Sequence, residues 1–304
     1  MEFGIIFDTH VDKWELIRYG EELGYDAAWV PDSQMIWSDC YATMALAAAH
    51  TKRIKIGTGV AIAGTRIAPV TAHSIASINQ IAPGRVFLGI GTGHTAMRVM
   101  GQDPVPVKEF REYLRVVRTL LEGREVDYTY AGKTRQIKFL HLDRHFINLD
   151  NQIPIYVAAN GPLALKAAGA YGDGWMTIST DPLGVQSAME QVKAGAKAAE
   201  RSLPAKYHTA CVTSACVLRP GDKETARFRQ IHDGHCTFLQ PEERRFVTPE
   251  AIRNTCIVGT PEEIISRLKG LEQAGVNEIV LLPPADYQRK VFRDFAEIVM
   301  PAFR

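Results

Sequence analysis

Short apolar runs alternate with amphipathic stretches along the whole chain, and this alternation limits its fold most strongly. Eight runs read as strands, at residues 3–7, 27–30, 54–60, 86–90, 155–158, 174–178, 207–217 and 278–282. Strands that are apolar on both faces and separated by helices indicate a parallel sheet covered on both sides. A doubly wound sheet usually has about five or six strands. We therefore predict an α/β fold of the (β/α)8 TIM-barrel type.

Two regions exceed the simple strand–helix repeat. Residues 123–151 contain two polar strand-like runs around a turn at 131–133, which predicts a β-hairpin excursion. Residues 221–253 are charged and irregular, and we expect a helix with a mobile lid there. No linker or repeat interrupts the chain, so we predict one domain over residues 1–304, with insertions.

Charge and cysteine content exclude several classes of function. The formal net charge is +1, which gives no field that would attract nucleic acid or an anionic membrane. No apolar run is long enough to span a bilayer, and the first residues resemble a strand rather than a signal peptide. The five cysteines are scattered and odd in number. These features favour reduced thiols in a cytoplasmic enzyme.

The loop after the fourth predicted strand is rich in glycine. It reads Gly91-Thr92-Gly93-His94, and in such loops the backbone can approach a ligand and successive amides can bind an anion. A tight turn explains the same run equally well. A dinucleotide fingerprint ending at Ala96 also fits the spacing, although that motif normally follows a first strand.

The loop after the fifth predicted strand offers a second candidate phosphate site. Asn160 and Gly161 precede Pro162, where a helix with free amides at its positive end is expected to begin. Capping of this helix by Asn160 is the alternative. Two neighbouring strand ends of this kind in a barrel favour a phosphorylated cofactor. We include Ser179, which follows the sixth strand, among the candidate cofactor contacts.

Other strand ends carry further candidates. Gly59 followed by the β-branched Val60 suits a bulge or an unusual peptide. Asp32 suits either a hydrogen bond to a ligand ring or the capping of a turn. His10 and His94 follow strands and are candidates for proton transfer, although a lone histidine is more often a polar loop residue.

Two other kinds of chemistry are disfavoured. His232, His235 and Cys236 lie close together in the sequence but lack a second spaced pair of ligands, so we predict no metal site. No serine has the context of a nucleophile elbow, so serine hydrolysis is unsupported.

Taken together, these junctions resemble the luciferase-like monooxygenase superfamily, which includes flavin-dependent monooxygenases and deazaflavin-dependent dehydrogenases and reductases. The scaffold is most similar to that of methylenetetrahydromethanopterin reductase. The more specific similar stretches are residues 83–91, which contain Pro-Gly-Arg before the fourth strand, and 258–263, which read Val-Gly-Thr-Pro-Glu-Glu. The resemblance implies a cis peptide at Gly59–Val60 behind the cofactor ring, with Asp32 near that ring. It also implies phosphate contacts from Gly91, Thr92, Gly93, Asn160 and Gly161.

Three departures from the deazaflavin-dependent pattern decide the predicted reaction. Those relatives usually have a histidine where this chain has Ser33 and an acid where it has His94, and the reductase has a glutamate where it has Ile6. We therefore predict an FMN-dependent monooxygenase of a small organic substrate, with His10 and His94 catalytic. A hydride-transferring enzyme that uses an F420-type deazaflavin is the alternative, and a non-catalytic flavin-binding protein is the second alternative.

The predicted partners follow from the resemblance. We expect a small-molecule substrate, a flavin reductase that supplies reduced flavin, and assembly into a homodimer or homotetramer.

Overall fold

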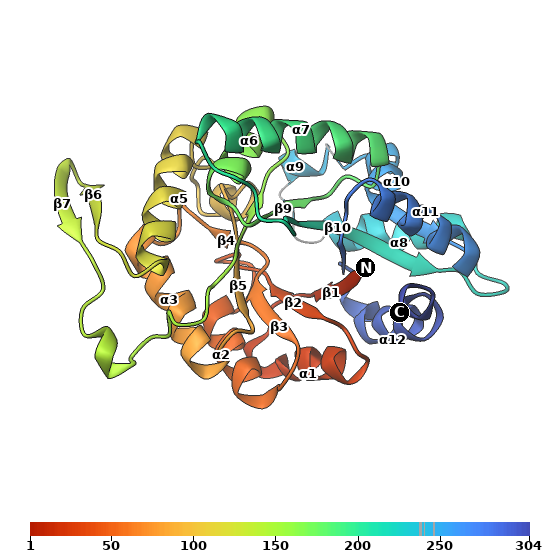
Figure 1. The fold of residues 1–304 in the computed structure, drawn as a ribbon. Coiled ribbons are helices and arrows are strands. Elements are labelled where there is room, and N and C mark those ends of the chain that lie inside the picture. Colours follow the sequence, from red (N-terminus) through yellow and green to blue (C-terminus); the bar gives the residue numbers. More distant parts are fainter. Residues whose placement is uncertain (237–238, 240, 246) are drawn as a thin grey trace.

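Eight parallel strands close into a barrel in the computed structural model, which describes all residues except 237, 238, 240 and 246 (Figure 1). The last strand pairs with the first, and β9 pairs with β10, so the ring has no open edge. The predicted (β/α)8 barrel is confirmed. Its strands are β1 (Glu2–Ile6), β2 (Ala27–Val30), β3 (Lys55–Thr58), β5 (Val86–Gly91), β8 (Ile155–Ala158), β9 (Gly174–Thr177), β10 (His208–Val217) and β12 (Glu278–Leu281).

Helices surround the barrel and bury one apolar face each (Figure 1). In α5, Phe110, Leu114 and Val117 recur at helical spacing and are fully buried. A capping box begins α11, where Thr260 and Glu263 satisfy each other's backbone amides. The main helices are α1 (Glu15–Glu22), α2 (Cys40–His50), α3 (Ala68–Ile81), α5 (Val107–Leu121), α6 (Pro162–Tyr171), α7 (Pro182–Ala198), α11 (Pro261–Gln273) and α12 (Gln288–Ile298).

Large aromatic side chains fill the interior of the barrel. The rings of Trp29 and Phe87 lie 4.5 Å apart, and Tyr156 packs against both. Glycine makes room for them, because a Cβ at Gly57 would lie 2.2 Å from the Phe87 ring. A second, larger apolar layer lies between the strands and the helices. The barrel is therefore a packed core, and ligands are expected at its ends.

Two strands of the structure were not predicted from the sequence. The third predicted strand stops at Thr58, and the chain pairs again with β5 as β4 (Ala61–Ile62). A strand at β11 (Cys256–Gly259) pairs with the second half of β10, which continues beyond its pairing with β9 and β12. Both additions lie where loops were expected.

The predicted hairpin excursion is present. Strands β6 (Val126–Tyr130) and β7 (Lys133–Ile137) pair antiparallel and project away from the barrel (Figure 1). Ala131 and Gly132 both have positive φ, which matches a two-residue hairpin turn.

The second excursion contains more helix than the sequence suggested. Its elements are α8 (Glu224–Cys236), α9 (Pro241–Arg244) and α10 (Pro249–Thr255), and α8 packs against α10. Shorter helical elements elsewhere are α4 (Thr95–Val99), η1 (Val11–Lys13), η2 (Leu142–Arg144), η3 (Ala285–Tyr287) and η4 (Met300–Phe303). Across the residues that the structure describes, no helix has the length and apolarity needed to cross a membrane.

Candidate functional site

The candidate residues gather at one end of the barrel. Because all eight barrel strands run in the same direction, the loops after their C-terminal ends lie around one rim. The residues placed there are His10 after β1, Asp32 after β2, Gly59 and Val60 after β3, Gly91 to His94 at β5, Asn160 and Gly161 after β8, and Ser179 after β9. The fold therefore brings together segments that are far apart in the sequence.

The junction of β3 and β4 contains a cis peptide between Gly59 and Val60. The amide of Gly59, in the preceding peptide, donates to the Val30 carbonyl at 2.7 Å, which holds Gly59 against β2. A Cβ at Gly91 would lie 3.3 Å from the Val60 side chain, so Val60 lies over the glycine end of β5. The expected cis bond is present, at the rim of the barrel.

The glycine loop after β5 requires glycine at one position. Gly93 has φ +75°, and a Cβ there would lie 2.3 Å from Ile62. The carbonyl of Thr92 accepts a hydrogen bond from the Val105 amide, so this oxygen faces the protein. The loop is thereby held close to β4 and the cis peptide.

Helix α6 begins without a side-chain cap. Gly161 is its N-cap residue, and Pro162 occupies the first turn. Capping by Asn160, the alternative reading, is wrong because Asn160 lies one residue before the cap position and is exposed. A Cβ at Gly161 would meet nothing within 4 Å. The positive end of α6 therefore has open space at Gly161 and no side-chain cap for its first amides, which begin after Pro162.

An open cleft of about 560 Å³ adjoins this helix end. The residues that line it include Asn160, Ser179, Thr180, Arg253 and Arg267. Within the described part of the chain, neither arginine pairs with a carboxylate. The cleft thus combines hydroxyl groups, amide side chains and two cations with one carboxylate, that of Asp181, which already caps α7; the two cations suit an anionic group.

Asp32 is buried and already has protein partners. Arg66 donates to its Oδ2 at 2.6 Å, Gln34 donates to Oδ1, and the Ile62 amide lies 3.4 Å from Oδ2. Burial alone would lower the pKa of Arg66, but the Asp32 carboxylate reverses this effect and raises the pKa. Arg66 also pairs with Asp39 at 2.9 Å. Asp32 therefore links β2 to the segment after β4, an arrangement that neither sequence reading foresaw.

The two predicted catalytic histidines are both exposed. His10 precedes η1, and His94 precedes α4, without a side-chain bond to either helix end. Both lie at the rim, but their side chains are not enclosed by it.

Asp8 is a site candidate that sequence analysis passed over. Ile6 packs inside the barrel while Phe7 packs outside it, and the same alternation, continued two residues past the end of β1, would place Asp8 on the side of Ile6. Burial and repulsion from Asp286 raise the pKa of the Asp8 carboxyl, although nearby His10 opposes the shift. Among the described residues, no hydrogen bond or salt bridge holds this carboxylate. Perturbed, unpaired acids of this kind cluster at functional sites.

The family follows from a comparison of the whole chain with known proteins. The model of the luciferase-like monooxygenase family matches residues 9–278. The chain belongs to this family. It is accordingly an oxidoreductase, and its scaffold is the one that the resemblance implied.

Individual relatives cover nearly the entire chain. It is 29% identical to the 5,10-methylenetetrahydromethanopterin reductase of Archaeoglobus fulgidus, over 95% of this chain and 96% of that one. It is 28% identical to the F420-dependent glucose-6-phosphate dehydrogenase of Amycolatopsis mediterranei, over 95% and 94%. The solved coenzyme F420-dependent tetrahydromethanopterin reductase of Methanopyrus kandleri superposes with a TM-score of 0.75 at 25% identity, covering 100% of this chain and 99% of that one.

Proposed function

We propose that this protein is a hydride-transferring oxidoreductase that uses an F420-type deazaflavin. The observation that carries the proposal is the near-complete match to relatives whose names state F420 dependence. This reverses the order of our two sequence hypotheses, in which an FMN-dependent monooxygenase came first. When bound, a deazaflavin supplies two-electron hydride transfer, whereas a flavin can also react with oxygen.

The residues at the rim fit a phosphorylated cofactor with a ring system. The uncapped amides of α6 would hold its phosphate, because Gly161 leaves the space before them open. The cis peptide at Gly59–Val60 would support one face of the ring. Arg253 and Arg267 would face negative charge on the cofactor tail or the substrate.

Asp8 offers the acidic group for proton transfer that the sequence pattern lacked. Hydride transfer to an unsaturated acceptor requires a proton at the neighbouring atom, and a carboxyl with a raised pKa suits the donor. The reductase pattern places its acid at the position of Ile6, and Asp8 is the next residue that faces inward. We propose that Asp8 handles this proton, in place of His10 and His94.

The FMN-dependent monooxygenase is retained as the second candidate because of Ser33 and His94. Neither matches the deazaflavin-dependent pattern. This candidate requires reduced flavin from a separate reductase and also consumes oxygen, whereas hydride transfer from a reduced deazaflavin consumes no oxygen.

Cofactor binding tests the choice directly. The full chain is titrated with oxidised F420 and, separately, with FMN, and both dissociation constants are measured by fluorescence. We expect F420 to bind at least about tenfold more tightly, a difference of about 1.4 kcal/mol. Tighter binding of FMN, together with oxygen consumption when reduced FMN is supplied, would reject the deazaflavin proposal.

A further inference from the structure

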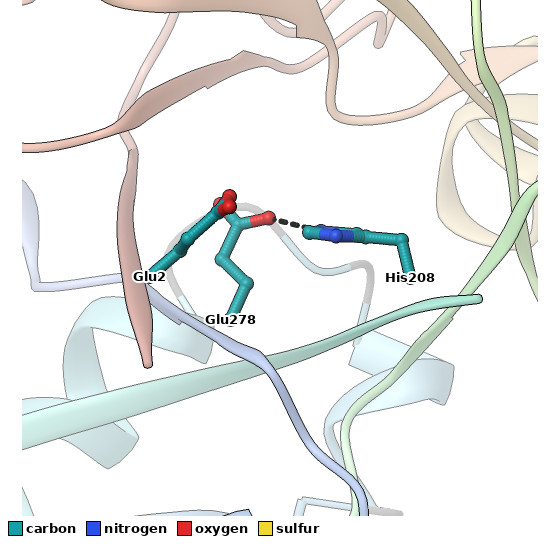
Figure 2. Close-up of side chains that lie close together, drawn as sticks. All are labelled: Glu2, His208 and Glu278. Carbon is teal, nitrogen blue, oxygen red and sulfur yellow. Dashed lines mark hydrogen bonds and ion pairs between the residues drawn. The ribbon is translucent and has the colours of Figure 1, made fainter. Parts of the chain in front are cut away.

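The floor of the barrel, opposite the candidate active site, carries a separate cluster of titratable side chains. Glu2, His208 and Glu278 are the first residues of β1, β10 and β12, which are neighbouring strands. Their side chains converge, with one potential ligand atom from each lying within 4.8 Å of the other two (Figure 2). His208 and Glu278 are buried, and Glu2 reaches the surface.

The surroundings of the cluster hold these side chains in place. A Cβ at Gly4 would lie 2.3 Å from Oε1 of Glu278, so only glycine leaves space for that carboxylate. Trp29 Nε1 donates to the same oxygen at 2.8 Å. The ring of Tyr156 stacks on the His208 imidazole at 4.5 Å. Such outer partners orient the ligands of metal sites.

The two carboxylates bring like charges together at the start of neighbouring strands. Glu2 and Glu278 are directly opposite each other in the β1–β12 register, where like charges destabilise a sheet. The structure shows three counter-groups: His208 Nε2 lies 2.6 Å from Oε2 of Glu278, and Lys55 and Lys206 lie 2.9 Å and 3.4 Å from the Glu2 oxygens. Both lysine side chains are largely exposed, at 45% and 76%, so they can turn into solvent at little cost.

We propose that Glu2, His208 and Glu278 form a binding site for a divalent transition metal of the zinc class. One imidazole nitrogen and two carboxylate oxygens are ligands that Zn²⁺ accepts, and three protein ligands leave a fourth position for water. Tetrahedral Zn²⁺ separates its ligand atoms by roughly 3.4 Å, so small side-chain rotations suffice. The ion would replace the His208–Glu278 hydrogen bond and displace both lysines. Its two charges would balance the two carboxylates.

The position of the site assigns its role. The cluster spans the seam where β12 meets β1, which closes the barrel. Residues at the N-terminal end of a TIM barrel generally serve stability, while chemistry occurs at the other end. Metal binding here would join three strands and add its binding free energy to folding.

The test uses the full chain after removal of metal by a chelator. Zn²⁺ affinity is measured by competition with a chromophoric chelator, and the melting temperature is recorded with and without Zn²⁺. Co²⁺ then serves as a spectroscopic probe. We expect one tight equivalent, a higher melting temperature with Zn²⁺, and Co²⁺ absorption without the charge-transfer band of a thiolate.

Glu2→Gln is the decisive variant because Glu2 is the least buried ligand and its loss is the least harmful to folding. We expect it to weaken Zn²⁺ binding at least about tenfold. His232→Gln is the matched control, since His232 lies near a cysteine, with its Nε2 3.8 Å from Cys236 Sγ, outside the proposed site. Equal Zn²⁺ affinity in Glu2→Gln and the wild type, loss of binding in His232→Gln, or no tight equivalent would each overturn the proposal.

Discussion

Substitution of Gly161 by alanine should weaken cofactor binding while leaving the stability of the fold nearly unchanged. The backbone at Gly161 has φ −87° and ψ 154°, which alanine adopts without strain, and the new methyl group would meet no atom within 4 Å. Alanine is a poorer N-cap than glycine by less than about 1 kcal/mol, and its stiffer unfolded chain offsets part of this. We therefore expect the melting temperature to change by no more than about 2 °C.

Binding should respond much more strongly. The methyl group would stand in the space through which a phosphate approaches the amides of α6. Loss of one hydrogen bond to a charged group costs about 1.5–3 kcal/mol, which corresponds to a roughly 10- to 150-fold weaker dissociation constant. Fluorescence titration with F420, paired with a thermal melt of the same sample, measures both effects.

Leu163→Ala is the control for this experiment. Leu163 is exposed in the first turn of α6, so its truncation alters the same helix start without adding an atom before the amides. It should leave F420 binding unchanged. If Gly161→Ala binds F420 as tightly as the wild type, the cofactor phosphate does not lie at α6 and the argument fails.

Two further predictions concern the acids at the rim. The raised pKa of Asp8 means that its ionisation costs stability as pH rises from the unfolded value, about 3.9, through the folded pKa, with the full cost above that. Asp8→Asn should therefore be more stable than the wild type in urea at neutral pH, with the gain vanishing in acid; equal stability at neutral pH would contradict the burial of this carboxyl. Arg66→Met leaves Asp32 buried without its cation and should cost about 3–5 kcal/mol in urea unfolding. Adding Asp32→Asn should recover part of that loss, and a purely additive double mutant would refute the pairing.

The barrel could be predicted because its signal is local and repeated. Each strand is an apolar run and each helix has its own periodicity, so eight weak signals support one another. The end of β10 shows where prediction from the sequence fails. Its long apolar run could be recognised, but the partner of its second half, β11, lies about forty residues away, beyond the charged region 221–253. The apolar run of β10 can be recognised in the sequence, but its pairing with β11 appears only in the folded structure.

The location of the candidate site could be predicted from the sequence, but the contacts of its residues could not. The glycines and Asn160 mark strand ends, which meet at one rim in any parallel barrel. The partner of Asp32 is Arg66, and no local pattern links the two positions. The cap of α6 depends on backbone angles, so the sequence could not show that Gly161, rather than Asn160, occupies the cap position. Asp8 could not be identified because the burial that raises its pKa arises from tertiary packing, which no local sequence pattern shows.

The position of Asp8 bears on how a departure from a family pattern should be interpreted. Ile6, where the related reductase has an acid, led us toward FMN because the proton-handling group had disappeared from its aligned position. In an extended strand, however, residues two apart face the same space, about 6.6 Å from one another. The proposed role of Asp8 follows this rule: its carboxyl, with a raised pKa, would serve the same mouth from two residues further along the chain. The absence of a family's acid argues against the family's reaction only when no nearby residue on the same face can replace it. After β1, we propose that Asp8 replaces it.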